Sequence, residues 1–208
     1  MQRALEIERL RSQLVIAEKD FLRAQINPHL LFNTLNFIRH ATKHNPANAS
    51  LAISALTDLM EYALEDSKSD HVPLNQEIEQ MENLIKLNRL RFEDQLNLNY
   101  TKDISNEKAI ILPIILLTLV ENIFKHGILN DPDHPAHIGI HANEQEISFR
   151  TSNLAAANGK TSGGQTGLKN ISARLAHAYP HSYDFVYGTK VNRFETQLTI
   201  TLDQKSRK

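Results

Sequence analysis

One stretch of this chain places a nucleophile beside a helix-bending residue. In QINPHLLFNT, residues 25–34, Pro28 precedes His29 within an apolar pattern that is typical of a helix. Proline inside a helix removes a backbone donor and costs roughly 3 kcal/mol. A neutral imidazole can attack a phosphoryl group and form a phosphoramidate. We interpret the bend as a means of presenting His29 at an exposed position where a partner can dock.

A second stretch, LVENIFKHG at residues 119–127, gathers polar residues on one side of an apolar helix. Glu121, Asn122, Lys125 and His126 lie at positions i, i+1, i+4 and i+5. An amide oxygen is a hard ligand for Mg²⁺, a lysine meets phosphate, and a glutamate can take a proton. The pattern suits a Mg²⁺-nucleotide, although ordinary solvation of an exposed helix face would give the same residues.

A third stretch, GGQTGLKNISARL at residues 163–175, runs from glycines into a helix. Backbone N–H groups at a helix start favour phosphate, and glycine allows a close approach. Lys169, Asn170 and Arg174 supply further donors. A flexible linker before a helix is the alternative interpretation.

The histidines at positions 134, 137 and 141 raise the question of a metal site. His137 and His141 are four apart on a predicted strand, and no fixed carboxylate partner is evident. We therefore disfavour a metal centre there.

The elements that position these residues begin with a heptad pattern over the first forty residues. Apolar residues recur three and four apart, and charged residues lie between them, which predicts one long helix that pairs with a copy of itself or with another helix. His29 falls off this seam, at a position that faces water. The simpler alternative is that Pro28 marks a helix start and His29 is an ordinary surface residue. The seam residues are Ile7, Leu10, Leu14, Ala17, Phe21, Ala24, Pro28, Leu31, Leu35 and Ile38.

Further along, polar and proline-containing stretches at 44–48 and 67–73 separate the predicted elements. We expect Asn75 to cap the helix over 76–92 and Pro113 to occupy the first turn of the helix over 113–126. The other predicted elements are a helix over 50–66, a strand over 96–101, a hairpin of 137–142 with 146–152, a loop over 155–167, a helix over 168–179 and a hairpin of 183–188 with 194–202. The second half is thus predicted to be α+β, with helices on one face of a mostly antiparallel sheet.

Composition excludes several classes of protein. The net charge of −1 gives no reason to expect nucleic acid as a partner, and the absence of cysteine excludes disulfides, zinc-thiolate sites and thiol catalysis. The longest apolar run, 109–120, is shorter than the ~18 residues of a membrane span and contains a proline and a threonine. The N-terminus is charged throughout, unlike a signal peptide.

Together, and in this order, these stretches resemble the sensor histidine kinases of the LytS/YehU type. The family signature is QxNPHFLFNxLN, a VPLxxE-led helix ending in RF, PxxLLxxLVENxxKHG and GxGLxNxxxRLxxxY. The matching segments here are QINPHLLFNTLN, VPLNQEIEQMENLIKLNRLRF, PIILLTLVENIFKHG and TGLKNISARLAHAY.

The resemblance implies a signalling helix over 1–20, a dimerising helical hairpin with the phosphoacceptor over 21–70, and an ATP-binding domain over 71–208. That domain would be an α/β sandwich of the Bergerat (gyrase, Hsp90 and kinase) type. His29 would be the phosphoacceptor, Asn122 would hold Mg²⁺, and Glu121 would assist beside the phosphates. The remaining nucleotide-binding residues implied are Lys125, His126, Asn153, Gly164, Gly167, Leu168, Asn170 and Arg174.

The implied activity is autophosphorylation of a histidine from ATP and transfer to an aspartate of a response regulator. The resemblance also implies a homodimer, a receiver domain as partner, and a cytoplasmic location below an inner-membrane sensor that lies outside this sequence.

The sequence departs from the family where many members carry a DxGxG box. RTSNLAAANGK, residues 150–160, lacks its aspartate and paired glycines, and Asn153 is the residue that could accept from the adenine amino group. Gln165 also replaces the first glycine of GxGL. A degenerate kinase that acts as a dimeric signalling scaffold, and a stand-alone ATPase that the N-terminal coil only dimerises, remain the alternatives.

Overall fold

The computed structural model describes residues 28–65, 70–155 and 164–202, and the chain divides into two compact units, Met1–Lys68 and Ser69–Lys208. The side chains of Pro28, His29, Leu64, Glu65, Asp94 and residues 164–166 are outside the description as well. The heptad prediction over 1–27 and the glycine-rich loop over 156–163 therefore fall outside the described residues.

Two helices, α2 (Pro28–His44) and α3 (Pro46–Glu65), pack against each other in the first unit. A single residue separates them, because the Asn45 side chain accepts a hydrogen bond from the Asn48 N–H at 3.1 Å and Pro46 follows at the first helical position. The predicted break was correct in place, but α3 begins four residues before the expected Ser50.

Small side chains fill much of the contact in this unit, while larger apolar ones remain exposed. The buried alanines are Ala41, Ala49, Ala52 and Ala55. The exposed apolar side chains are Phe32, Leu35, Leu51 and Ile53, each between 43% and 66% exposed. A helical unit with such a surface suits the predicted pairing with another helix.

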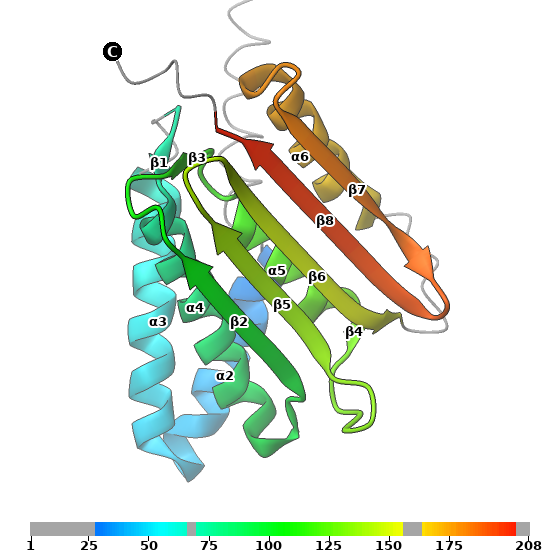
Figure 1. The fold of residues 1–208 in the computed structure, drawn as a ribbon. Coiled ribbons are helices and arrows are strands. Elements are labelled where there is room, and N and C mark those ends of the chain that lie inside the picture. The colour runs from blue at the N-terminus through cyan, green and yellow to red at the C-terminus, as the bar shows by residue number, and fades with distance from the viewer. Residues whose placement is uncertain (1–27, 66–69, 156–163, 203–208) are drawn as a thin grey trace, which may run out of the picture. The chain divides into compact units, whose positions relative to one another are not determined.

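The second unit contains a six-stranded sheet whose main path has the order β2-β5-β6-β8-β7 (Figure 1). Only β2 and β5 pair in parallel, and the other pairs are antiparallel, as the sequence predicted. A two-residue strand, β4, pairs with the end of β6, and β1 pairs with β3 in a separate ribbon. The strands are β1 (Val72–Pro73), β2 (Leu98–Ile104), β3 (Ile110–Ile111), β4 (Gly127–Ile128), β5 (Ala136–Ala142), β6 (Glu146–Ala155), β7 (Tyr183–Lys190) and β8 (Arg193–Thr201).

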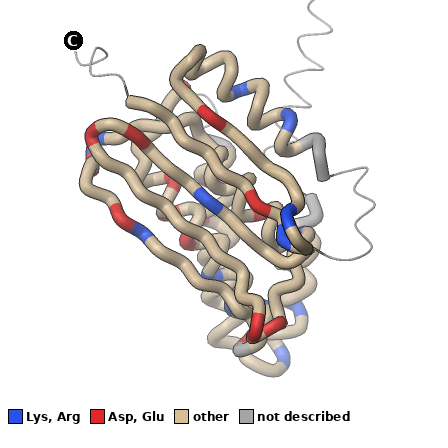
Figure 2. Tube along the Cα trace, turned by 45° about the vertical axis from the view of Figure 1, so that its right-hand side comes forward, with Lys and Arg blue, Asp and Glu red and all other residues tan. Residues whose placement is uncertain are grey.

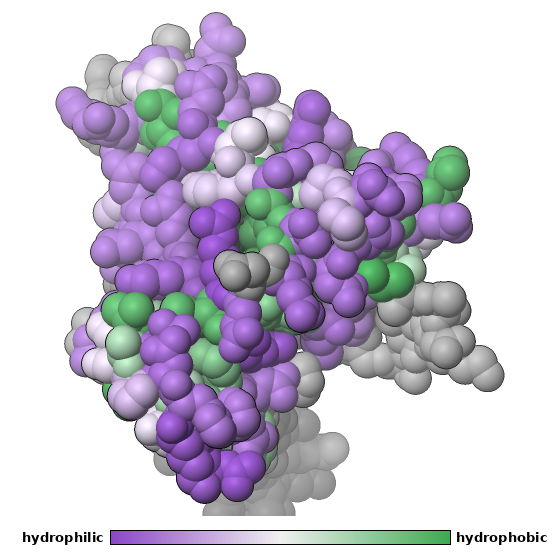
Figure 3. All heavy atoms as spheres, turned by 90° about the horizontal axis from the view of Figure 1, so that it is seen from below, coloured by the Kyte–Doolittle hydropathy of each residue, from purple (hydrophilic) through white to green (hydrophobic). Residues whose placement is uncertain are grey.

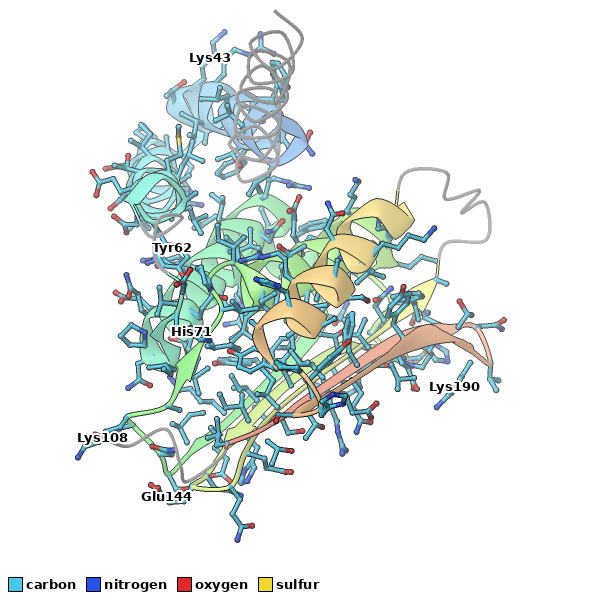
Figure 4. The ribbon with its side chains drawn as sticks, turned by 90° about the horizontal axis from the view of Figure 1, so that it is seen from above. Lys43, Tyr62, His71, Lys108, Glu144 and Lys190 are labelled. Carbon is cyan, nitrogen blue, oxygen red and sulfur yellow. The ribbon has the colours of Figure 1, made fainter. Side chains whose placement is uncertain are left out.

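Helices α4 (Leu74–Phe92), α5 (Ile115–His126) and α6 (Gly164–Ala178) cover one face of this sheet (Figures 1 and 4). A short 3₁₀ helix, η2 (Glu93–Gln95), follows α4. Strand residues alternate between the two faces, so that Ile138 and Ile140 are buried under the helices while His137 is exposed on the open face. In Figure 4, Lys190 and Glu144 mark opposite ends of the sheet. The resulting α+β architecture is the predicted one.

The starts of the three helices differ from the sequence prediction. Asn75 is not a cap: α4 begins at Leu74, after Pro73, and has no side-chain cap. Pro113 is not in the first turn, because Ile114 adopts a left-handed conformation (φ 67°) and α5 begins at Ile115. Helix α6 begins at Gly164, four residues before the expected start. The sequence predicted the three helices, but their first residues differ by two to four positions from the expected ones.

Charged side chains of both signs are interspersed along the chain (Figure 2). The face seen from below is mainly hydrophilic, with smaller apolar areas (Figure 3). Within the described ranges, no helix has both the length and the hydropathy needed to cross a bilayer.

The cap between α2 and α3 gives a first prediction. Asn45→Ala leaves the Asn48 N–H without its acceptor, so we expect the free energy of unfolding of the helical unit to fall by about 0.5–2 kcal/mol. Thermal unfolding followed by circular dichroism measures this. Ser50→Ala, at an exposed position of α3, is the control and should not destabilise. Equal melting temperatures for Asn45→Ala and the wild type would contradict the capping role.

Candidate functional site

Helix α5 has one strongly apolar face and one polar face. Its buried residues are Ile115, Leu116, Leu117, Leu119, Val120 and Ile123. Glu121, Asn122 and His126 are half-buried, and Lys125 is exposed. Because the apolar face fixes the rotation of α5 against the core, the four polar residues are held on its other side.

The end of α5 continues directly into β4, and this pairing brings Asn153 to the helix. Gly127 pairs with Ala155, and Ile128 with Leu154. A Cβ added at Gly127 would lie 2.7 Å from the Ile123 carbonyl oxygen and 3.0 Å from Asn153 Nδ2. A side chain therefore does not fit there, and glycine allows the helix end to approach β6.

Asn153 is itself buried, with 2% exposure, and its Nδ2 donates to the Leu154 carbonyl at 2.9 Å. The structure thus places Asn153 next to the end of α5. Whether it reads an adenine amino group stays a prediction.

Glu121 has an unusual protonation equilibrium. Burial raises the pKa of its carboxyl from 4.5 to about 7, and the positive charge of Lys125 opposes part of this effect. A carboxyl with a pKa near neutrality can take up or release a proton under physiological conditions.

Asn122 carries a buried polar atom that lacks a hydrogen-bond partner among the described residues, its Nδ2. Buried polar groups in folded proteins are almost always paired, so an orphan beside a titrating carboxyl indicates a ligand site. Asn122 and Glu121 offer oxygen ligands for a hard cation, and Lys125 offers a positive charge for phosphate. These residues fit a Mg²⁺-nucleotide.

Helix α6 packs beside α5 and contains most of the third stretch, residues 163–175. The Cβ position of Gly167 is 3.8 Å from Thr118 Cγ2 of α5. Leu168 is buried, Asn170 is exposed, and Gly164 is the first residue of the helix. The predicted glycine-rich loop is thus partly helical, with Gly167 inside the first turns.

Arg174 contacts protein backbone: its Nη2 donates to the Pro113 carbonyl at 2.7 Å. Tyr179, which follows the last residue of α6, adds a second contact, since its hydroxyl accepts a hydrogen bond from the Leu112 N–H at 3.0 Å. Burial raises the pKa of Tyr179 to about 12, so the hydroxyl stays protonated at neutral pH.

Glu77 is a functional candidate that the sequence analysis did not identify. It lies in the first turn of α4 with 0% exposure, and its two carboxylate oxygens accept the N–H groups of Ile114 and Leu116. The signal was available in its spacing, because Glu77, Met81, Leu84 and Asn88 follow one helical stripe and all are fully buried. A glutamate on such a stripe must have a buried partner.

His29 belongs to the first turn of α2, and its side chain lies outside the description. The exposure predicted for its ring therefore stays a prediction.

The other histidines do not assemble into a metal site within the described residues, where no group of three or more His, Cys, Asp and Glu side chains could hold an ion. His134 Nδ1 contacts Asp131 Oδ2 at 3.0 Å and His141 Nδ1 contacts Asp103 Oδ2 at 2.9 Å, in two separate pairs.

A surface hollow of about 500 Å³ lies on the second unit, and strands β2, β5, β6, β7 and β8 line it. None of the candidate residues borders this hollow. We therefore place the candidate site at α5 and α6.

Comparison with known proteins finds similarity to histidine kinases. The model of the histidine kinase family matches residues 17–96. The chain is 35% identical over 122 residues to the sensor histidine kinase YpdA of Escherichia coli strain K12, a match that covers 58% of this chain and 21% of that protein. It is 27% identical over 179 residues to the sensor protein LytS of Enterococcus faecalis, covering 78% of this chain and 30% of that protein. These matches confirm the resemblance of this chain to the sensor histidine kinases of the LytS type.

Solved structures give a more distant likeness. The catalytic domain of histidine kinase ThkA matches with a TM-score of 0.45 and 14% identity, covering 63% of this chain and 93% of that chain. The histidine kinase AdeS of Acinetobacter baumannii matches with a TM-score of 0.43 and 13% identity, covering 75% and 79%. The chain spans about a fifth to a third of the length of the curated relatives cited here.

Gly127 gives a prediction that separates two effects of replacing a glycine: the steric clash of the added Cβ and the loss of backbone freedom. Gly127→Ala forces a methyl group against the Ile123 carbonyl, so we expect a loss of about 1–3 kcal/mol in the free energy of unfolding. Urea denaturation provides the measurement. Gly188→Ala is the matched control, since nothing lies within 4 Å of its added Cβ, and its stability should change by less than about 0.5 kcal/mol. If both variants lost the same stability, the close approach at Gly127 would be wrong.

Glu121 gives a prediction about pH. A carboxyl whose pKa is higher in the folded state binds its proton more tightly there, so its contribution to stability falls as pH rises from about 4.5 to about 7. Glu121→Gln removes this titration. We expect the variant to match the wild type at pH 4.5 and to exceed it at pH 8 by about 1–2 kcal/mol, because partial contact with water reduces the full effect.

Urea unfolding at several pH values tests this expectation, with Glu107→Gln, at an exposed position, as the control for loss of one charge. A constant difference between Glu121→Gln and the wild type across this range would show that Glu121 is not the titrating group.

Proposed function

We propose that this chain is the kinase portion of a two-component sensor histidine kinase, an ATP-dependent protein-histidine phosphotransferase. The observation that carries the proposal is the polar side of α5, where a carboxyl titrating near pH 7 adjoins an asparagine with a buried, unpartnered amide nitrogen. The similarity to histidine kinases and the helical unit that contains His29 support the same activity.

In this proposal Asn122 holds Mg²⁺, which neutralises charge on the nucleotide phosphates. Lys125 and His126 lie beside the phosphates, and Asn153 lies near the adenine. Gly164, Gly167, Leu168 and Asn170 belong to the segment that closes over ATP. Arg174 belongs to the same segment, and it donates a hydrogen bond to the carbonyl of Pro113, two residues before α5.

The reaction is an in-line displacement at the γ-phosphorus of ATP. An imidazole nitrogen of His29 forms the new P–N bond while the bond from phosphorus to the β,γ-bridging oxygen breaks, and ADP leaves. The imidazole loses its N–H proton, and ionised Glu121 is the acceptor. The phosphoryl group then passes to an aspartate of a response regulator receiver domain.

In this proposal, residues 1–20 form a signalling helix, residues 21–70 form the dimerisation and phosphoacceptor region, and residues 71–208 form the catalytic domain. The chain acts as a homodimer at the cytoplasmic face of the inner membrane, below a sensor region outside this sequence. The exposed apolar residues of α2 and α3 support the homodimer.

A second candidate is a degenerate kinase that serves as a dimeric signalling scaffold. The environment of Asn153 favours it: this buried amide replaces the usual aspartate and already donates to the neighbouring Leu154 carbonyl. Calorimetry with Mg²⁺-ATP distinguishes the two, because a scaffold would give no binding heat at millimolar nucleotide.

Autophosphorylation tests the main proposal. With labelled ATP and Mg²⁺, we expect the wild-type chain to acquire an acid-labile label and His29→Gln to lose it completely. His40→Gln is the matched control, because His40 is an exposed histidine of the same helix and should leave labelling unchanged. Label retained by His29→Gln, or lost in His40→Gln alone, would remove His29 from its role.

A further inference from the structure

We propose that Glu77, in the first turn of α4, and Tyr179, the residue after α6, are positioning residues of the nucleotide site, which hold the first turn of α5 and the residues just before it. The inference rests on the proposed function, and it adds residues that need not touch the nucleotide. Arg174 supports the same turn, because it donates a hydrogen bond to the Pro113 carbonyl.

Helix α5 needs an external partner at its start. The first N–H groups of a helix have no carbonyl of their own to bind, and a side chain at the N-cap usually accepts one of them. The N-cap of α5 is Ile114, whose side chain has no acceptor. Glu77 takes this role from α4, with one carboxylate oxygen on the Ile114 N–H and the other on the Leu116 N–H, the latter at 2.9 Å.

The left-handed backbone at Ile114 shows how firmly this turn is held. A β-branched residue at φ 67° is strained and persists only where surrounding contacts determine it. The Thr118 hydroxyl donates to the Ile114 carbonyl at 2.6 Å, on the opposite side of the residue from Glu77's bond to its N–H. Both polar groups of the strained peptide are thus engaged.

Arg174 of α6 and Tyr179, which follows α6, hold the residues just before this turn. Tyr179 accepts from the Leu112 N–H and Arg174 donates to the Pro113 carbonyl. Since Leu112 and Pro113 are buried, these backbone groups have little water to replace the side chains. The helix that follows the glycine-rich segment is therefore tied to the helix that carries Glu121 and Asn122.

The consequence for the site follows from the length of α5. Helix α5 has only twelve residues, and the contact between Gly127 and Asn153 lies directly after its last one. A helix that short moves as a unit, so a displaced first turn shifts Glu121 and Asn122 as well. A misplacement of about 1 Å at a reacting group can cost ~10²-fold in rate.

The test compares Mg²⁺-ATP binding by isothermal calorimetry for the full chain and three variants, well below their melting temperatures. Glu77→Gln keeps one acceptor but turns an NH₂ group toward the second backbone N–H, and we expect at least tenfold weaker binding. Tyr179→Phe removes one oxygen atom, and we expect threefold to tenfold weaker binding. Ile200→Ala, at a fully buried position of β8, is a destabilised control whose affinity should stay within twofold of the wild type.

Backbone amide NMR gives a second readout that general destabilisation would not move. In Glu77→Gln, the Ile114 and Leu116 amides should shift upfield and exchange faster than those of β8, whereas Ile200→Ala should leave them unchanged.

Wild-type affinity in both Glu77→Gln and Tyr179→Phe would overturn the positioning role and leave the proposed function intact. An equal loss of affinity in Ile200→Ala would also overturn it, because stability alone would then explain the effect. Absence of nucleotide binding by the wild-type chain would overturn the proposed function, and the positioning role with it.

Discussion

The first turn of α5 depends on a carboxylate from another helix. Backbone N–H groups at a helix start are buried here, and an unpaired buried donor costs about 1–3 kcal/mol. Glu77 satisfies two of them at once and thereby joins α4 to α5. Because α4 and α5 both begin beside the β1–β3 pair and run in the same direction (Figure 1), one bridge at that end aligns the two helices along their length.

The other end of α5 is held by a different kind of constraint. At Gly127 the backbone passes so close to Ile123 and Asn153 that no side chain fits, which lets β4 join the sheet through β6. The polar side of α5 therefore lies between a hydrogen-bonded start and a sterically tight end. Under the proposed function this rigidity matters, since most of the catalytic effect of a phosphoryl-transfer site comes from placing charge accurately.

Glu121 and Asn122 illustrate how burial creates reactivity. A glutamate in water titrates well below neutrality, but the half-buried position on α5 raises the pKa of Glu121 to about 7. The amide nitrogen of Asn122 is buried and has no hydrogen-bond partner among the described residues. Because buried polar groups are almost always paired, this atom supports the proposal that a ligand binds here. The proposal of a scaffold has its strongest support at Asn153, where an amide stands in place of the carboxylate that many of the similar kinases carry.

The sequence by itself determined the resemblance to LytS-type kinases, the α+β class, the hairpins and the polar row of α5. These depend on residue identity and on periodicities of two and 3.6 residues, which short segments of the chain display. It did not determine where helices begin. Asn75 looked like a cap and Pro113 like a first-turn residue, but α4 begins one residue before Asn75, and the start of α5 follows hydrogen bonds from residues 37 to 67 positions away in the chain. Only the tertiary structure decided that Glu77 serves α5, that Arg174 contacts Pro113, and that Asn153 meets Gly127. Each of these contacts joins segments that pack together only when the apolar faces of the helices close over the sheet.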